Sequence, residues 1–238
     1  MKTLSISLYN RFDYTKILLD NLNTCYGIEE YDITICCEPG FDDVVELARS
    51  FRPDQTELIV NPRKYGCNTN IYQCLSIGFA KNDYHIHFED DTIPGKDCLK
   101  YFEWARAYKD DSDVFTVSAY TNSNNMTEHY YPKNDNVDEV YHREWFTPWG
   151  WATWKDRFQD IKYYWDFVGA RGSWDQSVNG IARKNRIEIC PTVSRVQNIG
   201  AEMATHVYSP EWHSKNHFNE YWIETNKKYS ERFMILCK

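Results

Sequence analysis

Three consecutive acids, Glu89, Asp90 and Asp91, are the residues of this sequence whose types and spacing point most directly to chemistry. They follow an apolar run at 84–88 and precede the turn residues at 94–95. Carboxylates that converge in a cleft repel one another, and a divalent cation compensates that repulsion. Their hard oxygen atoms favour Mg²⁺ or Mn²⁺. Taken alone, the three acids are equally compatible with a solvated acidic turn.

The elements that must position these acids alternate between strand and helix patterns. Strands are predicted at 3–9, 31–37, 57–60, 84–88 and 114–119, and helices at 13–25, 44–51, 68–81 and 96–108. The alternation predicts an α/β fold, with a mostly parallel sheet, right-handed crossovers and helices on both faces. Ligands of such sheets bind beyond the carboxyl ends of the strands, where the three acids lie.

The other strand ends are therefore candidate binding positions as well. They lie at 9–11, 38–40 and 61–66. None of them carries the glycine-rich phosphate motifs GxGxxG or GKS, and Gly66-Cys67-Asn68 is the nearest approach. This absence disfavours a dinucleotide-binding Rossmann enzyme and a P-loop ATPase.

Length and charge narrow the class of protein further. The chain has 238 residues, 42% of them hydrophobic, and we expect one domain over 1–238. A formal net charge of -8 argues against whole-surface affinity for nucleic acid, although a local basic site stays compatible with it. The sequence shows no signal peptide and no apolar run long enough for a membrane span. Its eight cysteines form no CxxC pair, so we expect a cytoplasmic protein with reduced core thiols.

The segment HFEDDTIPGKDCLKYF resembles the strand–EDD–turn–helix of GT-A-fold glycosyltransferases. The pattern is most similar to N-acetylglucosaminyltransferase I and to small bacterial and viral family-2-like glycosyltransferases, from about residue 4 to residue 218. The order of the motifs carries the resemblance: LYNR at 8–11, ICCEPG at 35–40, FEDD at 88–91, VSAYTNSN at 117–124, FTPWGWATWKDRF at 146–158, SWDQS at 173–177, PTVSRVQNIG at 191–200 and ATH at 204–206. It implies a GT-A (Rossmann-like) fold with a mixed, mostly parallel central sheet and an aromatic-rich acceptor side.

The resemblance also implies roles for single residues on the metal side of the site. Asp91 matches the metal-coordinating carboxylate of the family. Glu89 and Asp90 match residues that contact the donor's ribose and sugar hydroxyls, or water on the metal. His206 matches a C-terminal histidine that ligates the metal or contacts the diphosphate. The implied cofactor is Mn²⁺ or Mg²⁺.

Further positions are expected to contact the nucleotide or to act as the catalytic base. By resemblance, Glu38 takes the place of an acid that accepts a hydrogen bond from the uracil N–H, and Arg11 that of a basic residue near the nucleotide. Arg63 follows the third strand and could approach the nucleotide, or belong to a solvated loop. Asp175 falls in the region of the catalytic base. The GlcNAc transferase pattern has two adjacent acids there, and here only Asp175 of Asp175-Gln176 can serve.

Aromatic residues make up 16% of the chain and concentrate in 141–167. Trp149 and Trp151 flank a glycine, and we expect Trp149 first and Trp151 second to form a stacking wall for an acceptor sugar. The alternative is that these rings belong to the core, because Trp is highly buried on average. His85 and His87 share one face of a strand, and we interpret them as core residues. The polar segment 122–139 reads as a long binding loop or lid.

Together these features predict a metal-dependent, inverting glycosyltransferase of hexosyl or N-acetylhexosaminyl type. Residues 1–120 are expected to bind a nucleotide-sugar donor with UDP as the nucleotide, and residues 121–238 a carbohydrate or other hydroxyl-bearing acceptor. Three alternatives stay open: glycosylation of a hydroxymethylated DNA base, a carbohydrate-binding protein without activity, and a sugar-nucleotide hydrolase. The acidic charge disfavours DNA, because base modification usually calls for a basic surface.

Overall fold

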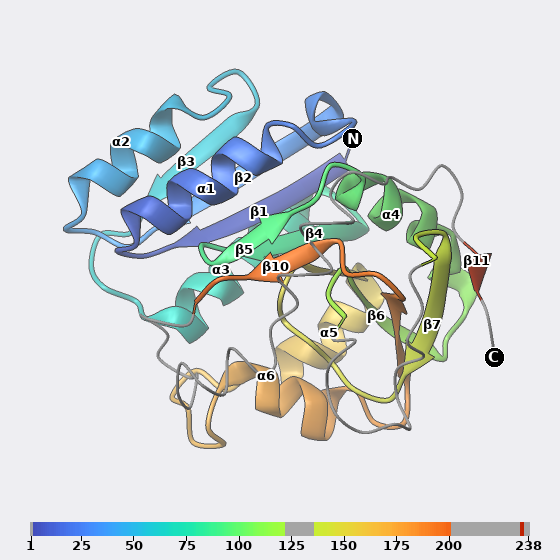
Figure 1. Ribbon diagram of the computed structural model, residues 1–238. Coiled ribbons are helices and arrows are strands. Elements are labelled where there is room, and N and C mark those ends of the chain that lie inside the picture. The colour runs from blue at the N-terminus through green and yellow to red at the C-terminus, as the bar shows by residue number, and fades with distance from the viewer. Residues whose placement is uncertain (1, 122–135, 201–233, 236–238) are drawn as a thin grey trace.

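A computed structural model describes residues 2–121, 136–200 and 234–235 (Figure 1). A nine-stranded sheet runs through the described part of the chain in the order β11-β7-β9-β6-β8-β4-β1-β2-β3. Its strands are β1 (Lys2–Leu8), β2 (Tyr31–Cys37), β3 (Thr56–Val60), β4 (Tyr84–Glu89), β6 (Val114–Ser118), β7 (Glu139–Arg143), β8 (Trp151–Trp154), β9 (Ile187–Pro191) and β11 (Met234–Ile235). A separate pair joins β5 (Thr92–Pro94) to β10 (Val196–Asn198).

The N-terminal part of the sheet is the parallel α/β unit that the strand and helix patterns predict. β1 pairs in parallel with β2 and β4, and β2 pairs in parallel with β3. The connecting helices are α1 (Phe12–Leu22), α2 (Asp42–Ser50), α3 (Cys67–Lys81) and α4 (Cys98–Ala105). The helix predicted over 96–108 is shorter than expected, because the chain tightens into a 3₁₀ helix at Arg106–Asp110.

The remaining strands make the sheet mixed. β8 lies antiparallel between β4 and β6, and β7 is antiparallel to β9. β9 runs parallel to β6, and β11 parallel to β7. Most neighbouring pairs are therefore parallel, and the predicted mixed, mostly parallel sheet flanked by helices is confirmed.

Two apolar cores cover the faces of the sheet. Residues of α1, α2 and α4 pack in the larger core, and residues of α3 pack in the smaller one with α5 (Lys155–Tyr163) and α6 (Trp174–Ser177). In Figure 1, α1 and α2 accompany β1–β3, whereas α5 and α6 lie at the lower end of the view. A Cβ atom added at Gly78 of α3 would collide with the ring of His85, so glycine lets this helix approach the sheet closely.

His85 and His87 are core residues, as their spacing indicates. Their exposed fractions are 1% and 0%. Ser5 Oγ lies 2.7 Å from His85 Nε2 and 2.9 Å from His87 Nδ1, which joins the two rings through one hydroxyl. Burial lowers the pKa of each histidine to about 3, so both rings are neutral near pH 7.

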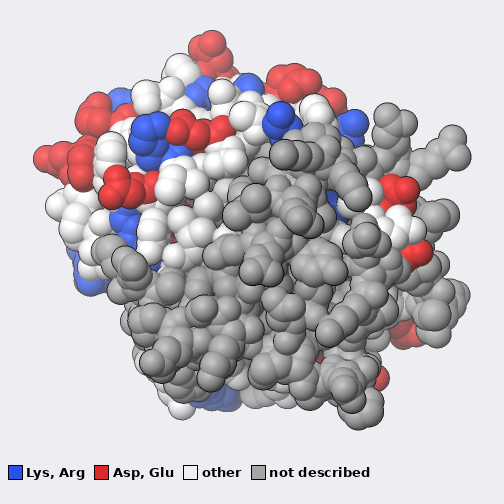
Figure 2. Space-filling view, in the orientation of Figure 1, with Lys and Arg blue, Asp and Glu red and all other residues white. Residues whose placement is uncertain are grey.

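Seven cysteines lie in the described part of the chain and none forms a disulfide; all but Cys67 are buried. Within the same residues, we find no helix that combines the length and the apolar character needed to span a membrane. Figure 2 shows acidic and basic side chains side by side over α1 and α2, and the described residues on this face form no continuous basic stripe.

Candidate functional site

Side chains from the carboxyl ends of the parallel strands meet at one edge of the sheet. The pairing register places Ser7 of β1 opposite Glu89 of β4, and Leu8 opposite Cys37 of β2. Arg11, Glu38 and the acids 89–91 follow these strand ends and therefore lie at the same edge, to the left in Figure 1. This edge is where ligands of open α/β sheets bind.

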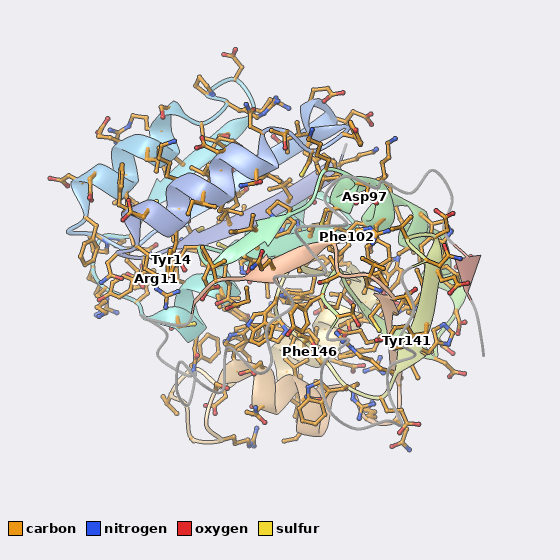
Figure 3. All side chains as sticks on the ribbon, viewed as in Figure 1. Arg11, Tyr14, Asp97, Phe102, Tyr141 and Phe146 are labelled. Atoms are coloured by element: carbon orange, nitrogen blue, oxygen red, sulfur yellow. The ribbon has the colours of Figure 1, made fainter. Side chains whose placement is uncertain are left out.

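Arg11 bridges two of the three acids. Its Nη1 atom lies 3.1 Å from Asp90 Oδ1 and 2.8 Å from Asp91 Oδ2. The side chains of all three residues are between 10% and 13% exposed, so water screens these contacts little. Figure 3 shows Arg11 beside Tyr14 at the beginning of α1. The structure thus joins Arg11 to the acidic motif, where the resemblance expects a basic residue.

The second oxygen of Asp91 is held by a segment more than 100 residues away in sequence. Asn198 Nδ2 donates to Asp91 Oδ1 at 3.1 Å, and Asn198 Oδ1 accepts from the Gly200 N–H at 2.9 Å. The Ile199 N–H also donates to the main-chain oxygen of Asp91 at 2.9 Å. A Cβ atom at Gly200 would collide with Asp91 Oδ2. Asn198 and Gly200 lie in the PTVSRVQNIG motif, but no role for either residue could be assigned from the sequence.

Two acids at this edge have raised pKa values. Burial, and then the neighbouring charge of Asp91, raises the pKa of Asp90 to about 7, although Arg11 opposes the shift. Burial, and then the charges of Asp91, Asp90 and Asp175, raises the pKa of Glu89 well above its usual range. The positive charge of Arg11 opposes both shifts but does not cancel them.

Asp175 joins this cluster from the other part of the chain. It lies in the first turn of α6, and its charge acts on Glu89 and on the thiol of Cys67 at the start of α3. The Ser173 hydroxyl donates to Asp175 Oδ1. The structure thus places Asp175 within electrostatic reach of Glu89, although 84 residues separate Asp91 from Asp175 in sequence.

The carboxylate of Asp166 holds the loop that precedes α6. The carboxylate of Asp166 accepts the backbone N–H groups of Val168, Ala170 and Arg171, at 2.7–3.3 Å. Asn68 Nδ2 donates to the Asp166 main-chain oxygen at 2.7 Å, which ties the loop to the N-terminal turn of α3. Trp165 and Trp174, which flank the loop, stack with ring centroids 4.8 Å apart. No sequence pattern identified Asp166 as the organiser of this loop.

The residues expected to hold a metal are only partly among the described ones. Within 2–121, 136–200 and 234–235, no group of three or more His, Cys, Asp or Glu side chains is arranged to hold a metal. His206 lies outside these residues. The donor chemistry fits a divalent cation, since Asp90 and Asp91 bring hard carboxylate oxygens together around one position, which Arg11 Nη1 occupies.

Glu38 and Arg63 lie near the same edge with different surroundings. Glu38 is 3% exposed, and its carboxylate accepts the N–H groups of Tyr65 and Gly66 at 2.7–3.1 Å. It therefore holds the 61–66 loop in place, and the expected contact with uracil stays a prediction. Arg63 is exposed, with its guanidinium 5.9 Å from the ring centroid of Tyr65. Lys64 Nζ lies 2.5 Å from the Tyr9 hydroxyl, so this loop carries positive charge to the edge.

The two tryptophans expected at the acceptor side differ in exposure. Trp151 is 1% exposed and packs edge-on against Phe146 and parallel to Trp174. It belongs to the smaller core, so the expectation that it forms an acceptor wall is corrected. Trp149 is half-buried and meets Tyr120 edge-on at 4.6 Å between centroids. The segment 122–135, most of the polar loop, lies outside the described residues.

The fold is shared with known glycosyltransferases. No protein-family model and no curated protein sequence matches the chain. Among solved structures, the mannosyltransferase PcManGT from Pyrobaculum calidifontis, in complex with GDP-Man and Mn²⁺, aligns with a TM-score of 0.58 over 96% of this chain and 65% of that one, at 13% identity. S. aureus TarS 1-349 in complex with UDP-GlcNAc aligns with a TM-score of 0.58 over 90% and 64%, at 12% identity.

A further structure of S. aureus TarS 1-349 aligns with a TM-score of 0.54 over 80% of this chain and 57% of that one, at 11% identity. The present chain thus spans less than two thirds of the length of these proteins. At such identities the likeness concerns the fold: this chain has the helix-flanked, mostly parallel sheet of glycosyltransferases.

Proposed function

We propose that this protein is a metal-dependent, inverting glycosyltransferase that moves a sugar from a nucleotide donor to an acceptor hydroxyl. One observation carries the proposal: Glu89, Asp90, Asp91 and Asp175 gather at the carboxyl edge of a sheet shared with glycosyltransferases. An acidic cluster at this edge suits a substrate that arrives with a cation and a diphosphate.

The donor is proposed to be a UDP-sugar with a hexosyl or N-acetylhexosaminyl group. Structures that share the fold are described with UDP, UDP-GlcNAc or GDP-Man, so the class of donor has support from more than one of them. Arg11, Glu38, Arg63, Glu89 and Asp90 are the proposed donor-binding residues. All of them follow strand ends at one edge of the sheet.

The cation is proposed to be Mn²⁺ or Mg²⁺, with Asp91 and His206 as the protein ligands. When bound, it would neutralise the diphosphate leaving group without proton transfer. Arg11 adds a positive charge beside the same carboxylates. The protein thus presents oxygen ligands and one cationic side chain where negative charge has to be accepted.

Asp175 is proposed to remove the proton from the acceptor hydroxyl as that hydroxyl attacks the donor sugar. A carboxylate positioned for this task contributes on the order of 10²–10⁴-fold in rate. If Asp175 acts from the face opposite the leaving group, the anomeric carbon is inverted and no covalent intermediate forms. Asp175 lies at the start of α6, beside the 166–172 loop. The acceptor is therefore proposed to bind to residues after 120, with Trp149 as the ring that stacks on it.

The direct test is a donor-and-acceptor screen. The protein is incubated with Mn²⁺, a panel of nucleotide sugars and a panel of glycan, lipid-linked, small-molecule and hydroxymethylated-DNA acceptors, and products are read by mass spectrometry. A mass increase of one sugar on an acceptor supports the proposal. Acceptor-independent release of UDP and free sugar would instead assign a hydrolase, and nucleotide binding without turnover would assign a binding protein.

A further inference from the structure

We propose that Arg11 is an exchangeable counter-ion: its guanidinium covers the carboxylate oxygens of Asp90 and Asp91, and it has to leave them when a divalent cation binds. The inference rests on the proposed function, because it takes these acids to be the cation site. It adds a role for Arg11 in the cation-free protein, beyond a contact with the donor.

The geometry of the contact is that of one small cation between two carboxylates. A single nitrogen, Nη1, reaches Asp90 Oδ1 at 3.1 Å and Asp91 Oδ2 at 2.8 Å. Charge-assisted hydrogen bonds of this length are among the stronger polar contacts in proteins. A divalent cation that used Asp91 Oδ2 would compete with them for the same oxygen. A cation that takes the position of Nη1 between the two carboxylates therefore requires Arg11 to give up at least one of the two contacts.

The charge of the entering ion favours such an exchange. Arg11 brings one positive charge to the carboxylates of Asp90 and Asp91. A divalent cation brings twice that charge in a more compact form. Because the side chains of the bridge are nearly buried, water screens the attraction between these carboxylates and a cation only weakly. Exchange of the guanidinium for the divalent ion therefore strengthens that attraction.

The other carboxylate oxygen of Asp91, Oδ1, is held by an amide and not by Arg11. The proposed exchange therefore concerns Oδ2. Asn198 is 4% exposed, donates to Asp91 Oδ1 and is itself fixed by the Gly200 N–H. It lies on β10, whose pairing with β5 sets Asn198 opposite Thr92, next to Asp91. An uncharged amide does not compete with a cation. It keeps the carboxylate oriented whether Arg11 or a metal faces Oδ2.

The backbone of Arg11 is fixed independently of the contacts that its side chain makes with the acids. Arg11 precedes α1, and its main-chain oxygen accepts the Thr15 N–H at 2.9 Å. The guanidinium carbon lies 5.8 Å from the ring centroid of Tyr14 while Nη1 contacts Asp90 and Asp91 (Figure 3). This cation–π contact does not use the carboxylate oxygens, so it is compatible with the loss of one of them.

The test is a titration of the full chain with Mn²⁺ alone, followed by calorimetry and by electron paramagnetic resonance of free Mn²⁺. Arg11→Met is expected to bind Mn²⁺ roughly tenfold tighter than the wild type, because no charge-assisted hydrogen bonds have to be displaced. Arg11→Lys should give a smaller gain, since lysine keeps the charge but loses the planar fork. Equal or weaker Mn²⁺ binding by Arg11→Met overturns the inference.

Lys16→Met is the matched control. It removes the same charge from α1, but Lys16 is exposed and pairs with Asp20 at 2.5 Å, so its Mn²⁺ affinity should equal that of the wild type. A gain in Lys16→Met as large as in Arg11→Met would show that net charge alone is responsible, and would also overturn the inference.

A wild-type measurement covers the case in which Arg11→Met does not fold. The side-chain N–H signals of Arg11, assigned by their loss in Arg11→Lys, are expected to shift when Mg²⁺ is added to the ¹⁵N-labelled wild type. Unchanged Arg11 signals at saturating Mg²⁺ contradict the exchange. These readouts involve no sugar transfer, so the two proposals can fail separately. Sugar transfer without the exchange would contradict this inference alone, and the exchange without sugar transfer would contradict the proposed function alone.

Discussion

Two groups of buried carboxylates in the described part of the chain, Glu188 and the acids beside Arg11, have opposite surroundings. Inside the sheet, Glu188 is fully buried, and Arg143 contacts its Oε1 through Nε at 2.7 Å. The Thr116 hydroxyl and the Thr147 N–H also donate to Glu188. At the edge of the sheet, Arg11 contacts Asp90 and Asp91, and the charges of Asp91, Asp90 and Asp175 act on Glu89.

The difference lies in how completely neighbouring donors surround each carboxylate. The Glu188 carboxylate is surrounded by donors from three strands or loops, so it is complete without a ligand. At the edge of the sheet, Arg11 contacts Asp90 and Asp91, and the pKa of Glu89 lies well above its usual range, so a bound cation can stabilise these acids further. Removing a partner of Glu188 should therefore reduce the stability of the fold. Removing an acid of the Arg11 cluster should instead impair ligand binding and catalysis.

The largest effect is expected for Asp91→Ala at the edge cluster. Because Asp91 is the proposed metal carboxylate, this change should abolish Mn²⁺-dependent binding of a UDP-sugar, measured by calorimetry. Asp20→Ala removes an exposed acid of α1 and serves as the control. Unchanged UDP-sugar affinity of Asp91→Ala in the presence of metal would reject the metal assignment.

Asp175→Asn tests the base within the same cluster. The amide keeps the shape of the side chain but cannot take a proton, so kcat should fall by about 10²–10⁴-fold while donor affinity is retained. Stopped-time transfer assays and calorimetry on one preparation measure both quantities. Transfer at a near-native rate would mean that another residue is the base.

Arg143→Met tests the structural pair. It leaves Glu188 buried without its cation, and we expect a loss of about 3–5 kcal/mol in the free energy of unfolding, measured with urea. The double variant Arg143→Met, Glu188→Met should recover most of this loss, because an apolar pair of similar volume replaces the ion pair. A loss below about 1 kcal/mol in the single variant would remove the contrast between the two regions.

The smallest effect concerns the neutral histidines of β4. Their pKa in the folded protein, about 3, is below the unfolded value of about 6.5, so the unfolded state binds more protons between these pH values. Each histidine should therefore cost about 2 kcal/mol of stability when the pH falls from 7 to 5. Imidazole NMR signals of His85 and His87 that titrate near pH 6 in the folded protein would contradict this.

Much of the fold could be predicted from local patterns. The strands 31–37 and 84–88 and the helix 68–81 are found within about one residue of their predicted limits, because apolar periodicity reports local burial directly. The placement of Arg11 and the acids at one edge followed from parallel pairing. What local patterns could not supply was contact between distant segments, such as Asn198 with Asp91 or Asp166 with Asn68.

The tryptophans also show that a local sequence pattern does not decide where a side chain lies in the fold. A Trp-Gly-Trp sequence suits a sugar-binding wall and a packed core equally well, and only the tertiary position of each ring decides. Trp151 is buried because it lies on β8, between β4 and β6, where both faces of the strand are covered. Trp149 precedes the strand and keeps part of its surface exposed.

The position of β8 in the sequence also affects folding during translation, because β8 is synthesised long after the strand β4 with which it pairs. β4 is complete by Glu89, yet its neighbour on one side, Trp151–Trp154, is synthesised about sixty residues later. Until then the growing chain carries an open strand edge, which is a template for pairing with other chains. Fragments that end before Trp151 are therefore expected to aggregate, and expression should depend on chaperones that shield the β4 edge during translation.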